Sequence, residues 1–237
     1  MSTQLIHRRH LKQYIGDAKS ILDVGCGNKP LRVATCIADK FPDTYTHKGK
    51  VHTENPKGMI KMLPGVKFVE ATLPQLPFKD KEFDFVFCSH VIEHVDDVAA
   101  GLKELARVAR RGYLECPRWW FEYVDCTPFH KWFIDFDGSE LVCKKKTDVE
   151  MQHLLDRRIF DKARGTFDQL YRTYDATFIE GIDKPKHRAF EKVRRMLAPK
   201  RYPSLEEQMR NKQFAAVCLY WEDSIPFRIS SSSAYAL

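Results

Sequence analysis

The stretch SILDVGCG, residues 20–27, decides the fold of this chain. Its first five residues form a short apolar run, which is typical of a buried parallel strand, and Gly25 and Gly27 follow directly. Glycines at the carboxyl end of a strand let the backbone turn sharply and approach a ligand with no side chain between. Ligands bind at that edge of an open α/β sheet. Asp23 adds a carboxylate that can organise the turn and meet a cationic group of a ligand.

The segments around this stretch alternate between strand and helix patterns. Short apolar runs predict strands at residues 33–38, 66–70, 83–88 and 113–116, and apolar residues at helical spacing predict a helix at residues 98–109. This alternation predicts an α/β fold built on a doubly wound, mostly parallel sheet. An amphipathic helix ending at Ile15 should precede the sheet, and strands at residues 214–220 and 225–229 should complete it.

The length of 237 residues suits one elaborated domain, which needs no disulfide or metal to hold its core. We divide it into a ligand-binding core (residues 1–118), a basic and partly helical cap (residues 119–213) and C-terminal strands (residues 214–230). Seven cysteines without a CxxC pair predict reduced thiols and a cytoplasmic protein. No apolar run approaches the 18 or so residues that a membrane span needs.

The net charge of +7 is concentrated in one segment. Residues 141–212 hold 18 Lys and Arg against 11 Asp and Glu, so this segment alone carries the excess of +7. We interpret it mainly as a solvated, largely helical surface, and the alternative is a docking surface for nucleic acid. Acidic residues are interspersed among the basic ones, which weakens the nucleic-acid interpretation.

Aromatic residues are concentrated just before that segment. Residues 118–136 contain eight of them, too many for a solvated linker, so the stretch should lie over a pocket or under a lid. Trp119 and Trp132 are therefore candidate substrate-binding residues. His130 lies among them, and it could line an acceptor pocket or be a packed histidine.

These motifs together resemble the class I S-adenosylmethionine-dependent methyltransferases. ILDVGCG matches the first motif of that family, LPFKDKEFDFVFCSHVIEHVDD (residues 76–97) matches the region of its fourth strand, and ELARVARRGYLECP follows in the expected order. The strings IADKFPD, CSHVIEH and PFHKWF are similar to a small uncharacterised branch, of the methyltransferase type 11 kind. The resemblance implies S-adenosylmethionine as the cofactor.

The resemblance also implies positions for the cofactor. Gly25, Cys26 and Gly27 should approach its methionine portion, and Asp23 should help to hold its amino group. An acidic residue that closes the second strand should accept hydrogen bonds from the ribose hydroxyls, and we choose Asp39. The connection from the glycine turn is short for a parallel crossover. The competing register therefore makes residues 31–40 a helix and Glu54 the ribose acceptor.

The adenine and methyl ends of the cofactor have further implied contacts. Where many relatives carry an aspartate for the adenine amine, this chain has Thr72, whose hydroxyl can still accept a hydrogen bond without charge assistance. The backbone of Leu73 could read another edge of the adenine. Ser89 should lie at the sheet edge that faces the transferred methyl.

Histidines are the candidate general bases. His90 and His94 follow the fourth strand of the family pattern, and a neutral imidazole with a pKa near 6.5 could take the proton of a hydroxyl acceptor. Each could instead be structural, with His94 orienting a loop or pairing with Glu93, and His130 is the third candidate. The spacing HxxEH could also hold a divalent metal, but we predict none.

The predicted activity is methyl transfer to an oxygen of a small molecule or a glycan sugar. One alternative is an RNA or protein methyltransferase that uses residues 141–212. Another is a non-catalytic module that binds the cofactor and regulates a partner. The sequence leaves the acceptor, the pathway and the oligomeric state open.

Overall fold

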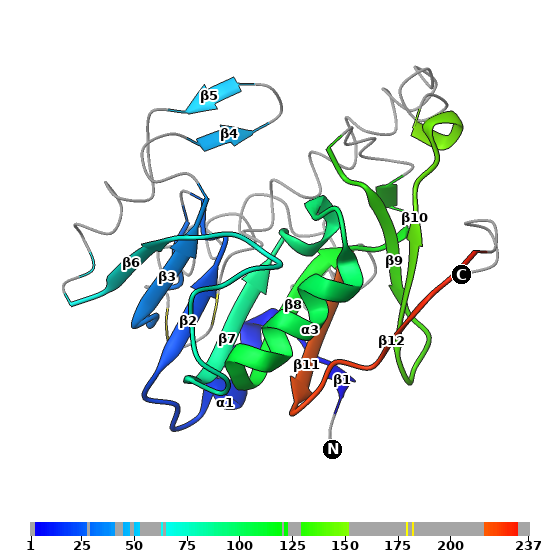
Figure 1. Ribbon diagram of the computed structural model, residues 1–237. Helices are drawn as coiled ribbons and strands as arrows, with labels where there is room; N and C mark the ends of the chain where they lie inside the picture. Colours follow the sequence, from blue (N-terminus) through cyan, green and yellow to red (C-terminus); the bar gives the residue numbers. More distant parts are fainter. Residues whose placement is uncertain are drawn as a thin grey trace, which may run out of the picture.

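The computed structural model describes residues 3–27, 29–40, 45–47, 50–52, 63, 65–119, 121–122, 129–151, 179, 182 and 216–231. Its largest element is a seven-stranded sheet in the order β1-β11-β8-β7-β2-β3-β6 (Figure 1). Five neighbouring strands of that sheet are parallel. They are β2 (Ile21–Val24), β3 (Cys36–Asp39), β6 (Lys67–Glu70), β7 (Phe83–Ser89) and β8 (Ala109–Pro117). The predicted α/β fold with a mostly parallel sheet is confirmed.

Two antiparallel strands extend the sheet on its β8 side. β11 (Ala216–Glu222) pairs with β8, and β1 (Gln4–Leu5) pairs with β11. The N-terminal segment therefore is not the amphipathic helix expected up to Ile15. Leu5 lies opposite Leu219 in the sheet, and the helical part is limited to η1 (Arg8–His10) and α1 (Leu11–Ile15). Pairing with a strand more than 200 residues away outweighs the local helical pattern.

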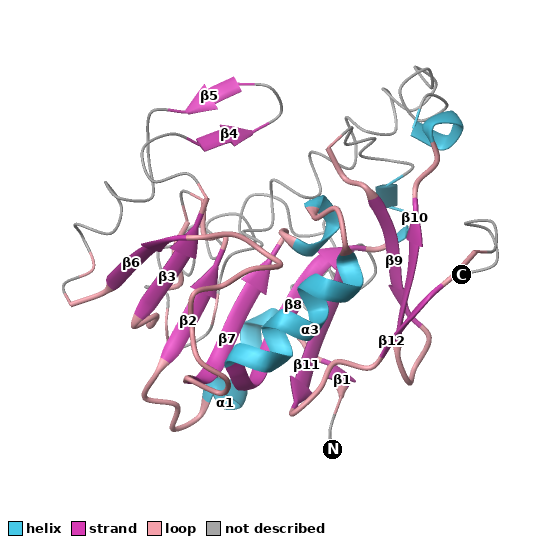
Figure 2. Cartoon of the chain, in the orientation of Figure 1, coloured by secondary structure: helices cyan, strands magenta, loops and turns pink. Residues whose placement is uncertain are grey.

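Helices cover both faces of the sheet, and the buried residues form two layers (Figure 2). Alternate residues of a strand point to opposite faces. Accordingly Leu22 and Val24 pack in the layer of α3 (Val98–Val108), while Ile21 packs in the layer of η1 and α1. Burial on both faces explains why β2 is apolar throughout, apart from its aspartate.

A second sheet of three strands stands beside the first (Figure 1). It consists of β9 (Trp132–Phe136), β10 (Leu141–Lys145) and β12 (Phe227–Ile229). β12 pairs in parallel with β10, so the prediction that residues 225–229 complete the main sheet is wrong, and only β11 does so. The basic segment likewise begins as a strand and not as a helix. Most of that segment lies outside the described residues.

The position of β3 decides between a strand and a helix in the segment before Asp39, which the sequence left open. β3 begins at Cys36 and pairs with β2, so a helix over residues 31–40 is wrong. The connection from Gly25 to Thr35 contains no helix in its described part, and Asp39 ends the strand. Glu54 lies outside the described residues. A separate two-stranded sheet, β4 (Tyr45–His47) with β5 (Lys50–His52), follows β3 in the chain.

Two further predictions concern disulfide bonds and membrane-spanning helices. No disulfide joins the cysteines of the described part of the chain, and Cys126 lies outside it. No helix in that part is long and apolar enough to cross a membrane.

Candidate active site

The carboxyl ends of the parallel strands meet at one edge of the sheet, and the glycine turn lies there. The Gly25 N–H donates to the Ala38 carbonyl at 2.7 Å, and the Gly27 N–H donates to Oδ2 of Asp39 at 2.9 Å. Both glycines have a positive φ, +67° and +54°, which residues with a side chain rarely adopt. The turn is thus fastened to the end of β3, and this edge is where open α/β sheets bind ligands.

Gly25 also allows a close contact within the protein. A Cβ atom at this position would lie 2.4 Å from Cγ2 of Val91, a residue of the segment that follows β7. The sequence predicted that this glycine leaves room for a ligand. In the structure it leaves room for Val91, and it thereby brings the turn against the segment that carries His90 and Glu93.

Asp23 is a buried carboxylate with an unused acceptor. Its Oδ2 accepts the Leu31 N–H at 2.7 Å, whereas its buried Oδ1 has no hydrogen-bond partner among the described residues. Burial raises the pKa of Asp23 to about 7, although the Leu31 hydrogen bond opposes the shift. An unpartnered carboxylate oxygen beside a glycine turn suits the positively charged amino group of a ligand.

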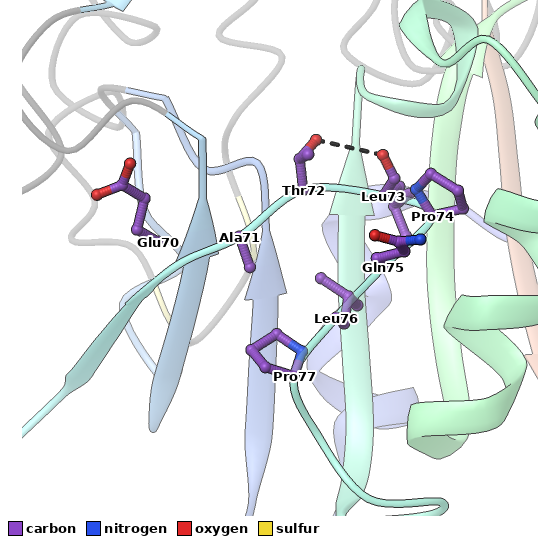
Figure 3. A pocket seen from close by; sticks show the side chains of 8 residues that line it. All are labelled: Glu70, Ala71, Thr72, Leu73, Pro74, Gln75, Leu76 and Pro77. Atoms are coloured by element: carbon purple, nitrogen blue, oxygen red, sulfur yellow. Dashed lines mark hydrogen bonds between the residues drawn. The ribbon is translucent and has the colours of Figure 1, made fainter.

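Beyond β6, eight consecutive residues line a hollow of about 460 Å³ (Figure 3). They are residues 70–77, and they include Thr72 and Leu73. The Thr72 hydroxyl donates to the Leu73 carbonyl at 3.4 Å. The Leu73 side chain is buried in the core, so only its backbone is available to a ligand. The Ala71 N–H donates to the Asp39 carbonyl at 3.1 Å, which joins this hollow to the end of β3.

Ser89 at the end of β7 has a partner that the sequence analysis missed. The buried guanidinium of Arg8 donates to Oγ of Ser89 at 3.0 Å and to Oε2 of Glu115 at 3.1 Å. It also lies 5.0 Å from the ring centre of Phe87. One arginine of the N-terminal segment therefore reaches the edge of the sheet, and no motif around it could have indicated this.

His90 lies between two buried carboxylates. Its Nδ1 is 3.2 Å from Oε1 of Glu93, and its Nε2 is 3.2 Å from Oε1 of Glu115. Burial alone would lower the pKa of His90, but the hydrogen bonds to Glu115 and Glu93 outweigh it and raise the pKa to about 9. Carboxylates engage both ring nitrogens, which argues against His90 as the general base and leaves His94 and His130 as candidates.

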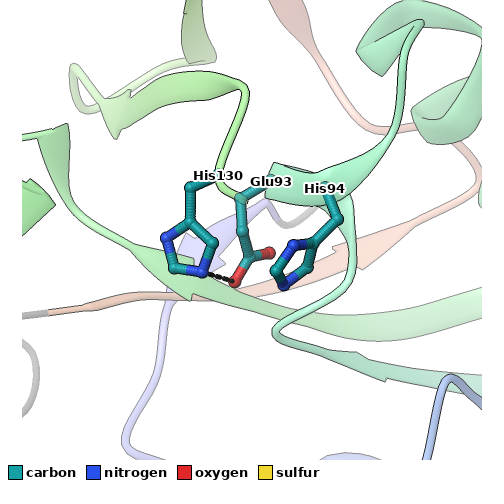
Figure 4. Close-up of side chains that lie close together, drawn as sticks. All are labelled: Glu93, His94 and His130. Carbon is teal, nitrogen blue, oxygen red and sulfur yellow. Dashed lines mark ion pairs between the residues drawn. The ribbon is translucent and has the colours of Figure 1, made fainter. Parts of the chain in front are cut away.

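Glu93 and two further histidines form a compact cluster (Figure 4). Glu93 and His94 lie in η2 (Ile92–His94), and His130 precedes β9. The two imidazole rings are in edge-to-face contact, with centres 4.7 Å apart, and Figure 4 shows the Glu93 carboxylate close to both of them. His130 Nδ1 is 2.7 Å from Oε1 of Glu122, whose Oε2 in turn accepts from Lys146 at 2.7 Å. Sequence reasoning had found the histidines but not Glu122, because no local pattern distinguishes it.

The two tryptophans have different surroundings. Trp132 is buried in the core, and its indole N–H donates to the Val95 carbonyl at 2.8 Å. We therefore correct its assignment from substrate binding to packing. Trp119 is partly exposed, and its side chain hydrogen-bonds to Asp135. It stays a candidate for the acceptor side.

The sequence of this chain is similar to those of known methyltransferases. The family model described as "Methyltransferase domain" matches residues 22–114. The chain is 30% identical over 210 residues to a fatty-acid O-methyltransferase of Mycolicibacterium smegmatis, covering 81% of this chain and 69% of that protein. It is 30% identical over 125 residues to a demethylmenaquinone methyltransferase of Geobacillus stearothermophilus, covering 47% of this chain. The match spans only 53% of the length of that relative.

Solved structures were matched as well, at low sequence identity. One is the YcgJ protein of Bacillus subtilis, with 17% identity and a TM-score of 0.39 over 89% of this chain and 94% of that one.

Proposed function

This chain belongs to the class I S-adenosylmethionine-dependent methyltransferases, and we propose that it methylates an oxygen of a small molecule or a glycan sugar. The observation that carries the proposal is the contact between the glycine turn and the segment of the histidine–glutamate cluster, through Gly25 and Val91. A donor held at the turn would then lie beside the cluster, where an acceptor would bind.

The residues at the turn fit the cofactor of this family. The free Oδ1 of Asp23 suits its amino group, Asp39 at the end of β3 suits the ribose hydroxyls, and the hollow at Thr72 suits the adenine. When bound, S-adenosylmethionine supplies a methyl group already activated by its positive sulfur. The protein therefore contributes mainly by holding donor and acceptor in line.

The acceptor side consists of the described residues beyond β7 and β8. His94 is exposed there, while Glu93 and His130 are buried behind it, so polar groups face an accessible position. The name of the fatty-acid O-methyltransferase places the methyl group on oxygen in that relative, which supports an oxygen acceptor here. It also adds carboxylate oxygens to the acceptors worth testing.

The test combines donor binding with turnover. We expect S-adenosylhomocysteine to bind by calorimetry, and Asp39→Ala to weaken binding by ~1–3 kcal/mol, through loss of charge-assisted hydrogen bonds to the ribose. Asp17→Ala is the matched control, because its side chain is 96% exposed and precedes the opposite end of β2. It should leave binding unchanged, and equal loss in both variants would contradict the assignment of Asp39.

Turnover is measured as label transferred from the methyl-labelled donor to a set of sugars, small hydroxyl compounds and fatty acids. A folded protein that binds the donor and labels none of them would favour the non-catalytic alternative. RNA binding that persists above physiological salt would favour the nucleic-acid alternative, since phosphate contacts weaken steeply with salt. In the described part of that segment, Lys144 pairs with Glu150 and Lys146 with Glu122.

A further inference from the structure

Three potential metal ligands meet in the cluster of Glu93, His94 and His130. One ligand atom from each lies within 4.8 Å of the other two. Figure 4 shows the carboxylate close to both rings, and the Nε2 atom of His130 is 3.9 Å from Oε1 of Glu93. Two of the three side chains are buried and His94 is accessible, so an ion could enter from the side of His94.

Each of these side chains is oriented by a partner on its other polar atom. Nδ1 of His94 is 3.2 Å from the Phe129 carbonyl, and Nδ1 of His130 is 2.7 Å from the Glu122 carboxylate. Oε1 of Glu93 is 3.2 Å from Nδ1 of His90. Metal-binding histidines almost always donate the second ring N–H to a carboxylate or a backbone carbonyl, and ligating carboxylates are hydrogen-bonded in turn. The remaining atoms are Nε2 of both rings and Oε2 of Glu93.

Oε2 of Glu93 is the second observation, independent of the spacing. It is buried and has no hydrogen-bond partner in the part of the chain that the structure describes, and the Glu93 residue is only 1% exposed. Two neighbouring buried carboxylates each pair with a fixed cation, Glu115 with Arg8 and Glu122 with Lys146. Among the described residues Glu93 pairs only with histidines. A buried carboxylate oxygen without a partner is costly, and a bound cation would remove that cost.

We propose that Glu93, His94 and His130 bind one divalent transition-metal ion on the acceptor side of the site. Two imidazoles and one carboxylate suit Zn²⁺, Co²⁺, Mn²⁺ or Fe²⁺, whereas Mg²⁺ and Ca²⁺ prefer oxygen ligands alone. His90 is not a ligand, because both of its ring nitrogens are engaged. The inference departs from the expectation of no metal and from the HxxEH ligand set, since His130 takes the place of His90.

Such an ion would deepen the proposed function. Three protein ligands leave a coordination position open, and an oxygen acceptor bound there would lose its proton more readily and be held for attack. Metal–ligand bonds near 2.1 Å place tetrahedral ligands roughly 3.4 Å apart, so the three atoms would draw together by about 1 Å on binding. The accessible His94 ring can make that movement.

The experiment titrates the purified protein with Co²⁺ alone and records visible absorption and stoichiometry, with Zn²⁺ as the competitor. We expect one cobalt ion per chain and its displacement by zinc. His94→Ala should weaken binding at least 100-fold, and it should fold, because this side chain is exposed. Glu122→Gln alters the partner of a ligand and also the partner of Lys146. In folded protein it should weaken binding by about 10- to 100-fold.

The matched control is the double variant His7→Ala/His10→Ala, whose rings are 6.3 Å apart in the N-terminal segment and could bind cobalt adventitiously. It should leave binding within about threefold. Loss of binding in this control, unchanged binding in folded His94→Ala, or no binding by the wild-type protein at millimolar Co²⁺ would each overturn the site. A protein that binds cobalt but labels no acceptor would overturn the proposed reaction and leave the metal site standing.

Discussion

At the scale of single residues, the candidate site combines residues that act through the local backbone with residues that act through distant partners. The aspartate and glycines of ILDVGCG act through the local backbone, so their place at the carboxyl end of β2 followed from the pattern. Arg8 and Glu122 act through partners that are distant in sequence, since Arg8 meets Glu115, 107 residues away. No spacing rule identifies such residues. The proton state of His90 was unpredictable for the same reason.

The prediction at the scale of residues concerns Asp23 and the pH dependence of ligand binding. Its pKa of about 7 lies above the usual 3.8, so its ionisation destabilises the folded protein as pH rises from about 4 through 7. Only the ionised form suits a cationic ligand group. We therefore expect the affinity for S-adenosylhomocysteine to rise by up to about tenfold per pH unit between pH 5.5 and 6.5, and to level off above 7.

Calorimetry over pH 5.5 to 7.5 tests this, because an α-amino group with a pKa of about 7.7 stays mainly protonated there. Asp23→Asn is the control: its amide oxygen can still accept the Leu31 N–H, but it cannot ionise. The variant should bind more weakly and with a nearly flat pH profile. A wild-type profile that is equally flat would rule out Asp23 as the partner of the amino group.

At the scale of elements, apolar runs predicted the five parallel strands, because a strand buried on both faces must be apolar along its length. The starts of two were misplaced: β3 begins at Cys36 and not at residue 33, and β8 at Ala109 and not at residue 113. The structure has strands at Ile21–Val24, Lys67–Glu70 and Phe83–Ser89, within about two residues of the prediction. The N-terminal helix and the place of residues 225–229 were predicted wrongly. In both cases a pairing partner elsewhere in the chain decides the structure: β11 for the first and β10 for the second.

The prediction at the scale of elements concerns the contact between the glycine turn and Val91, and its effect on the free energy of unfolding. Gly25→Ala should reduce the free energy of unfolding by about 2–4 kcal/mol, because it forces a side chain into a positive φ and against Val91. Adding Val91→Ala should recover at least about 1 kcal/mol of that loss, since it removes the overlap but not the backbone strain. Urea unfolding of both single variants and the double variant measures the coupling. Simple additivity would mean that the two elements do not touch as described.

At the scale of the whole molecule, charged side chains connect segments that the sequence keeps far apart. The ion pairs and hydrogen bonds run from Arg8 in the N-terminal segment to Lys146 beyond β10. The intermediate members are Glu115, His90, Glu93, His130 and Glu122. Basic and acidic side chains alternate along this series. It passes from the main sheet to the second sheet, and it includes the cluster to which we assign the metal.

The first link of this series supports the last prediction. Arg8 and Glu115 have side chains only 11% and 1% exposed, so removing the arginine would leave a buried carboxylate short of its strongest cation. Arg8→Met should therefore lower the free energy of unfolding by about 3–5 kcal/mol. The control is the exposed pair of Arg107 with Asp80, whose side chain is 79% exposed. Asp80→Ala should cost less than about 1 kcal/mol.

The two ion pairs should also differ in their salt dependence, because salt screens exposed charges and screens buried charges much less. In urea unfolding, raising the salt concentration to 1 M should largely remove the effect of Asp80→Ala and leave most of the effect of Arg8→Met. If Arg8→Met lowers the free energy of unfolding no more than Asp80→Ala does, the ion pair of Arg8 with Glu115 does not stabilise the attachment of the N-terminal segment to the sheet. Ser89 and His90 would then owe their positions to the strand alone, and the alternating series would begin at Glu115.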